Sequence, residues 1–179
     1  MPLLTAAVVV LTVLVLVDLA LTLAVVRHLR AGARPTATPV PELVGTRVGS
    51  PTPHFTASGE DGVELVAADL AGTPTLLAFF STTCEACVEH APALVAEVPR
   101  LAAAGIVVVP VLVGDGDPLE LAPALRHAGP LVREEHGGEV STAFGVRGTP
   151  SYVLLGADTR VAAAGLVLQD VVSSAATVR

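Results

Sequence analysis

Three hydrophobic patterns follow one another along the chain. Residues 3–26 are almost continuously apolar, residues 27–47 show no apolar period, and later residues form short apolar runs between polar turns. At roughly 1.5 Å per residue, about 24 apolar residues can cross a hydrocarbon core of about 30 Å. We therefore predict a transmembrane anchor at residues 1–27, a Pro/Thr/Ala-rich tether at 28–47 and one domain at 48–179.

The alternative to an anchor is a cleaved signal peptide. The apolar run exceeds a typical signal-peptide core, nothing cationic precedes it, and no clear small-x-small cleavage site follows it, so we favour an uncleaved single span. Its one charge, Asp18, is by itself a weak sign of function. Arg27, Arg30 and Arg34 follow the span, and positive residues favour the cytoplasmic side of a membrane. Taken alone, that bias would place the domain inside the cell.

The pattern in the domain is typical of an α/β fold. Two apolar runs, 73–80 and 105–114, suit strands buried on both faces, and residues 84–103 between them have helical spacing, which makes a parallel βαβ unit. We expect a four-stranded central mixed sheet with helices on both faces. The other predicted elements are two short strands within 54–65, a helical corner at 67–72, a helix at 117–129, a strand at 130–133, a helix at 139–146, an antiparallel hairpin of 149–156 and 160–167, and a final helix from Gln169.

Composition excludes several functions. The formal net charge is −7, all ten cationic residues are Arg, aromatic residues make up 3% and Trp is absent, so the chain lacks the basic patches and stacking rings that bind nucleic acid. Two cysteines cannot form a disulfide framework. Together with His90 they supply fewer than the four ligands of a structural zinc site. We therefore expect redox chemistry, with no metal and no cofactor.

Both cysteines lie in the stretch "FFSTTCEACVEHAP", where the helix predicted at 84–103 begins. Unpaired N–H groups and the positive end of the helix dipole favour a thiolate there, and we expect the hydroxyl of Thr82 or Thr83 to cap the helix. Cys87 lies one turn after Cys84 on the same side. We therefore predict that Cys84 is the exposed attacking thiol and Cys87 the shielded resolving thiol.

A second motif, "GVRGTPSYVLL", lies about 60 residues later. A proline directly before a buried strand, after Gly and Thr, fits a cis-proline turn, although the X-Pro bond is trans by default. With the cysteines at the carboxyl end of the first parallel strand, the predicted layout is thioredoxin-like.

Taken together, the two motifs resemble those of the TlpA/ResA-like membrane-anchored thioredoxin family of thiol–disulfide oxidoreductases. The form F-x-S-x-x-C-x-x-C-x-x-x-x-P, ending at Pro92, resembles the MauD-like branch, and the likeness covers residues 48–172. It implies that Cys84 is the nucleophile, that Cys87 is the resolving thiol, and that Pro150 is a cis-proline facing the disulfide. Thr149 would present its backbone to an extended substrate segment. Apart from the resemblance, Pro92 inside the helical pattern predicts a kink.

The resemblance also implies a location and partners. The domain would lie on the outer face of the cell membrane, against the charge bias, because that bias is a tendency and a single span has only one loop to count. Its substrates would be protein disulfides, and its electrons would come from a membrane thiol donor. We therefore predict a membrane-anchored oxidoreductase that reduces or isomerises protein disulfides. The residues between the cysteines, "EA", leave the direction of electron flow open.

Three positions depart from the family pattern. Thr83 stands where Trp is usual, and Ala78 stands where thioredoxin has a buried acid. Some tethered members carry a Glu inside C-x-x-C as a proton handler, and Glu85 matches that place. Two readings stay open for Glu85, which either moves protons for the couple or is a solvated acid that stabilises the helix start.

Three other functions compete with this prediction. A peroxiredoxin-like peroxidase shares the fold, but its usual Pro and Thr are replaced by Leu77 and Ser81. A copper chaperone of the SCO-like kind uses C-x-x-x-C, one residue longer than the spacing here, with a distant His such as His127 or His136. A non-catalytic anchored scaffold would not need Cys84.

Overall fold

The computed structural model describes residues 15, 18–19, 44–117 and 119–175. Most of the predicted anchor and tether therefore lies outside the described residues. Within the predicted anchor, the described residues Val15, Asp18 and Leu19 are helical. None of the helices built from described residues combines the length and apolarity needed to span a membrane.

A five-stranded mixed sheet forms the centre of the domain, in the order β5-β4-β3-β6-β7. Strand β3 pairs in parallel with β4, and β4 with β5, whereas the β3–β6 and β6–β7 pairs are antiparallel. The prediction of four strands is wrong, because β5, predicted only as a short separate strand, pairs with the end of β4 and buries Val132. The strands are β3 (Thr75–Ser81), β4 (Val107–Val113), β5 (Val132–Glu134), β6 (Ser151–Leu155) and β7 (Val161–Gly165).

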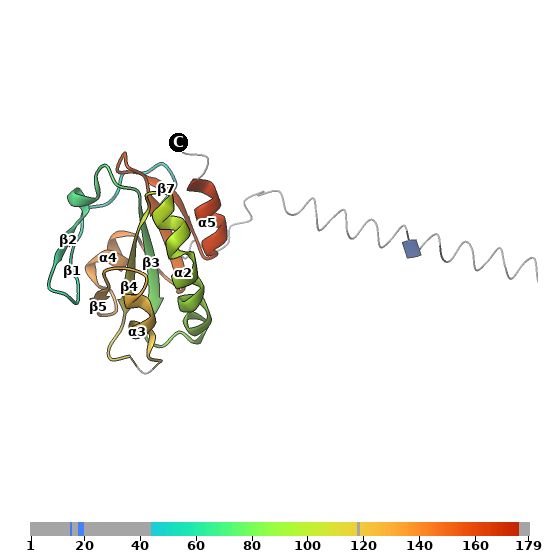
Figure 1. Ribbon diagram of the computed structural model, residues 1–179, viewed down its shortest axis with the longest axis horizontal. Helices are drawn as coiled ribbons and strands as arrows, with labels where there is room; N and C mark the ends of the chain where they lie inside the picture. Colours follow the sequence, from blue (N-terminus) through green and yellow to red (C-terminus); the bar gives the residue numbers. More distant parts are fainter. Residues whose placement is uncertain (1–14, 16–17, 20–43, 118, 176–179) are drawn as a thin grey trace, which may run out of the picture. The chain divides into compact units, whose positions relative to one another are not determined.

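Helices cover both faces of this sheet, as predicted (Figure 1). One face carries α2 (Glu85–Ala103), α3 (Leu121–Arg126) and α5 (Leu168–Ala175). The other face carries α4 (Glu139–Ala143), together with the hairpin β1–β2 and the 3-10 turn η1. The bounds of these three smaller elements are β1 (Thr56–Ser58), β2 (Glu64–Val66) and η1 (Ala67–Leu70).

The uninterrupted apolar run of β3 fits its place at the centre of the sheet. Successive side chains of a strand point to opposite faces. Ala78 and Phe80 therefore join the core beneath α2, while Leu77 and Phe79 join the core beneath α4, and all four are fully buried. This burial fixes the carboxyl end of β3, and with it the start of α2.

The residues just before the predicted domain boundary belong to the domain. Val44 forms a β-bridge with Val146, and the N–H of Gly45 donates to the carbonyl of Gly145 at 2.9 Å. The approach is tight, since a Cβ on Gly145 (φ +61°) would lie 3.0 Å from the Cα of Gly45. The Thr46 hydroxyl also donates to the Phe144 carbonyl at 2.7 Å. Residues 44–47, assigned to the tether from their composition, therefore pack on the domain because Val44 gains burial there.

Candidate active site

The loop between β3 and α2 places the two cysteines. Cys84 occupies the N-cap position of α2 with extended backbone angles, and Cys87 lies in the first turn. Both thiols are free; Cys84 is partly exposed and Cys87 is fully buried. This agrees with the predicted pairing of an accessible thiol with a shielded one.

The predicted hydroxyl cap is wrong. Cys84 itself takes the N-cap place, and α2 has no capping hydrogen bond from a side chain. The Thr83 hydroxyl instead lies 3.3 Å from that of Ser81. The Thr82 hydroxyl is buried and has no hydrogen-bond partner among the described residues, because the backbone of Thr82 pairs with β4 and turns its side chain inward.

The second sequence motif meets the first at Cys84. The Thr149–Pro150 peptide bond is cis, as expected, and leads directly into β6. The Sγ of Cys84 donates a hydrogen bond to the Thr149 carbonyl over 3.2 Å. Two segments about 65 residues apart in sequence therefore form one site at the carboxyl end of β3.

The two thiols have opposite tendencies to ionise. For Cys84, burial opposes the thiolate, but hydrogen bonds from the Cys87 and Thr149 side chains and from the N–H groups of Cys87 and Ala86 outweigh burial and lower the pKa. For Cys87, burial and the hydrogen bond with Cys84 raise the pKa to about 11. Cys84 is thus the better nucleophile at neutral pH, because the thiolate is the form that attacks.

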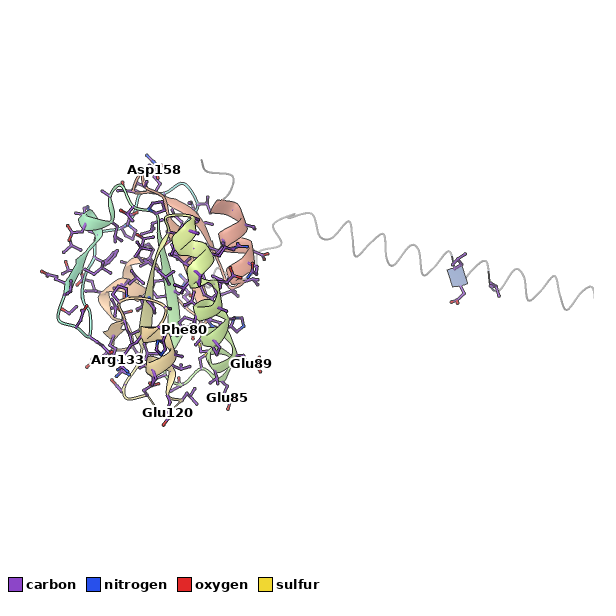
Figure 2. The ribbon with its side chains drawn as sticks, viewed as in Figure 1. Phe80, Glu85, Glu89, Glu120, Arg133 and Asp158 are labelled. Atoms are coloured by element: carbon purple, nitrogen blue, oxygen red, sulfur yellow. The ribbon has the colours of Figure 1, made fainter. Side chains whose placement is uncertain are left out.

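Glu85 lies at the first position of α2 and is exposed to solvent. Figure 2 shows it at the periphery of the domain, like Glu89, whereas Phe80 lies in the interior. No described residue forms a hydrogen bond or ion pair with the Glu85 side chain. The structure therefore gives Glu85 a place at the positive end of a helix, which suits an acid, without a contact to either sulfur.

A tyrosine and a histidine that the sequence analysis did not connect also lie at the site. Tyr152 is buried on β6, and its hydroxyl lies 3.5 Å from Nδ1 of His90 on α2. Burial, and next the charge of the Cys87 thiolate, raise the pKa of Tyr152 far above its usual range. The spacing of His90, one helical turn after Cys87, and of Tyr152, two residues after the cis-proline, was the available signal in the sequence.

A pocket of about 450 Å³ opens beside the cis-proline loop. Its walls include Ser81, Val113, His136 and Thr149. In the described part of the chain, no three His, Cys, Asp or Glu side chains cluster as metal ligands would. Neither His127 nor His136 therefore joins the cysteines in such a cluster.

Comparison with known families now identifies the domain. The model of the AhpC/TSA family matches residues 48–164, which is most of the chain. The chain belongs to the AhpC/TSA family. No curated protein matches the sequence of this AhpC/TSA member.

Solved structures establish the fold of this AhpC/TSA-family domain. It resembles the thioredoxin domain of a thiol-disulfide oxidoreductase from Bacteroides vulgatus, with a TM-score of 0.62 and 18% identity over 74% of this chain and 97% of that one. For a thiol:disulfide interchange protein from Bacteroides sp., the TM-score is 0.61 and the identity is 18%, over 74% of this chain and 90% of that one. For a secreted disulfide oxidoreductase from Mycobacterium tuberculosis, the TM-score is 0.55 and the identity is 22%, over 68% of this chain and 95% of that one. The fold is thus thioredoxin-like, of the kind found in thiol–disulfide oxidoreductases.

Proposed function

We propose that the domain is a thiol–disulfide oxidoreductase that reduces or isomerises disulfides of other proteins through Cys84 and Cys87. The observation that carries this proposal is the contact of 3.2 Å between Cys84 Sγ and the carbonyl of Thr149, the residue before cis-Pro150. It joins an accessible thiol of lowered pKa to the backbone of the cis-proline loop, next to a buried thiol of raised pKa.

The reaction follows from the difference between the thiols. The Cys84 thiolate attacks one sulfur of the substrate disulfide, the substrate S–S bond breaks, and the departing sulfur takes a proton. Cys87 then loses its proton and attacks Cys84 Sγ, which releases the second substrate sulfur and closes the Cys84–Cys87 disulfide. The substrate gains two electrons and the domain loses two. In isomerisation, another substrate thiolate instead attacks the substrate sulfur that is bonded to Cys84 Sγ. A new disulfide forms within the substrate, the bond to Cys84 breaks, and Cys84 leaves as a thiolate, so the domain stays reduced.

The segment before β6, which contains Thr149, binds the substrate. Thr149 offers its main chain beside the reacting sulfur, and an extended peptide can pair with it much as an added strand pairs with a sheet edge. The pocket lined by Ser81, His136 and Thr149 gives the peptide side chains a place next to that segment. Main-chain pairing is tolerant of sequence, which suits an enzyme that acts on several proteins.

The finer assignment is part of the same proposal. The apolar run 3–26 and the motif ending at Pro92 support a membrane-anchored enzyme of the TlpA/ResA-like family, MauD-like branch. We place the domain on the outer face of the cell membrane, where a membrane thiol donor would re-reduce it. A topology reporter fused after Arg47 tests this, because activity of the reporter only in the cytoplasm would refute it.

The function itself is tested with the reduced full chain and insulin as the disulfide substrate. We expect insulin reduction by the wild type and none by Cys84→Ser, while Cys87→Ser should accumulate mixed disulfides with proteins in cells. Hydrogen peroxide is the comparison substrate. If peroxide consumption greatly exceeded insulin reduction, the enzyme would be a peroxidase despite Leu77 and Ser81.

A further inference from the structure

The surroundings of Cys87 lack an acid that could accept its proton. The strands β3 and β4, packed beneath α2, carry no ionisable side chain, and Ala78 of β3 lies in the same apolar core as Cys87. On the neighbouring helices, Arg126 of α3 is paired with Glu60, and Asp170 of α5 is exposed. Yet Cys87 has to lose a proton before it can attack the mixed disulfide.

Tyr152 fills the side of the site where that acid is missing. Its Cα is the cross-strand partner of the Ala78 Cα in the β3–β6 pair, so both side chains enter the core beneath α2. The Tyr152 ring packs edge-on against Phe80, with centroids 6.2 Å apart, and the side chain is 1% exposed. Cys87 and Tyr152 belong to the same buried core beneath α2.

His90 links this buried hydroxyl to solvent. It lies three residues after Cys87, so both side chains project from the same side of α2. The distance of 3.5 Å from its Nδ1 to the Tyr152 hydroxyl is at the outer limit of a hydrogen bond. The ring is half-buried, whereas Glu85 and Glu89 on the same helix are exposed (Figure 2).

We propose that Tyr152 and His90 form a proton relay for Cys87, a role that rests on the proposed oxidoreductase function. As Cys87 attacks Cys84 Sγ, its S–H proton passes to the Tyr152 oxygen while the Tyr152 O–H proton passes to Nδ1 of His90. A bond forms between the two cysteine sulfurs, the bond from Cys84 to the substrate sulfur breaks, and that sulfur leaves as a thiolate. His90 then carries the proton, which it gives to water or to the departing thiolate. When the disulfide is reduced, the same groups return the proton.

The relay is tested on the reduced full chain in a stopped-flow reaction with dithiobis(nitrobenzoate). The first phase is attack by Cys84, and the second is release of the remaining thionitrobenzoate as Cys87 closes the disulfide. We expect His90→Gln and Tyr152→Phe to slow the second phase by about tenfold or more at neutral pH, and to change the first by less than about twofold. The matched control, His127→Gln, should change neither phase.

The pH profile separates a relay from a packing role. In the wild type, the rate of the second phase should depend on pH, and His90→Gln should lose part of that dependence. Imidazole added to His90→Ala should restore part of the rate. A second phase that keeps the wild-type rate and pH profile in these variants would overturn the relay and leave the proposed function intact. A wild type with no second phase would overturn both.

Discussion

Cys84 and Cys87 are one helical turn apart, and yet the domain treats the two thiols in opposite ways. Cys84 lies at the N-cap, partly exposed, where N–H groups and neighbouring side chains favour its thiolate. Cys87 lies against the apolar face of the sheet, where burial holds the proton on sulfur. The difference shows that burial and hydrogen bonding can give two thiols one helical turn apart opposite tendencies to ionise.

The largest effect should come from removing the exposed member of the pair. Cys84→Ser should reduce insulin-reducing activity to the background rate, because no other described thiol is accessible. Cys87→Ser is the matched variant, and it should keep the first attack while stalling as a mixed disulfide. The contrast fails if Cys84→Ser retains activity, or if Cys87→Ser stalls no more than the wild type.

A second experiment compares the two thiols directly. With a pKa of about 11, Cys87 is ionised in only about one molecule in a thousand at pH 8. Iodoacetamide should therefore alkylate Cys84 at least about a hundredfold faster than Cys87 at that pH. Peptide mapping by mass spectrometry after brief labelling measures the ratio. Comparable labelling of both thiols in the folded protein would contradict the claim that only Cys84 is accessible and readily ionised.

The Thr149 side chain offers a test of what lowers the pKa of the Cys84 thiol. Its hydrogen bonds lower the pKa of both thiols, so Thr149→Val should raise both and slow alkylation of Cys84 at neutral pH by severalfold. Thr142→Val is the control, because Thr142 is exposed on α4 and its hydroxyl bonds to the Gly137 carbonyl. An unchanged pH profile of Cys84 alkylation in Thr149→Val would show that the Thr149 hydroxyl has no part in activating the thiol.

The raised pKa of Cys87 also has a consequence for stability. The native state keeps the proton up to about pH 11, whereas the unfolded thiol loses it near pH 9.0, so the native state binds more protons between these values. The stabilisation from Cys87 is thus complete below about pH 9 and is lost as pH rises through about 11. Urea unfolding of the reduced protein at a series of pH values should show the free energy of unfolding fall between about pH 9 and pH 11. The fall with pH should be smaller in Cys87→Ala. The same fall of the unfolding free energy with pH in both proteins would contradict this contribution from Cys87.

The smallest effect is expected at Glu85. The exposed carboxylate contacts neither sulfur, so Glu85→Gln should change the alkylation profile of Cys84 and the rate of insulin reduction by less than about twofold. A larger change, with a shifted pH profile, would favour the other reading of Glu85 as a proton handler for the couple.

The parts of the site that sequence could predict are those carried by short motifs. The C-x-x-C at a helix start predicts which thiol is accessible, and a Thr-Pro before a buried strand points to the cis bond that the structure shows at Pro150. The βαβ unit follows from two apolar runs and the helical period between them. Each of these signals is local, since neighbouring residues along the chain determine it.

What sequence missed depends on partners far away in the chain. The proximity of Tyr152 to His90 follows from the register that sets Tyr152 opposite Ala78, and no short motif fixes that register. The fifth strand was left out of the sheet because three paired residues are too few to show a period. Residues 44–47 read as tether because their packing partners lie about 100 residues later, near Gly145.

The central claim is that Cys84 and Cys87 form one reversible two-electron couple. A redox titration tests this claim most directly. The protein is equilibrated in glutathione buffers of graded potential, its free thiols are alkylated, and the mass of the intact chain is measured by mass spectrometry. The account predicts a single transition between a form with two alkylated thiols and a form with none, in which the Cys84–Cys87 disulfide has formed. A form with glutathione on Cys84 and a free thiol at Cys87, persisting across the titration, would contradict it.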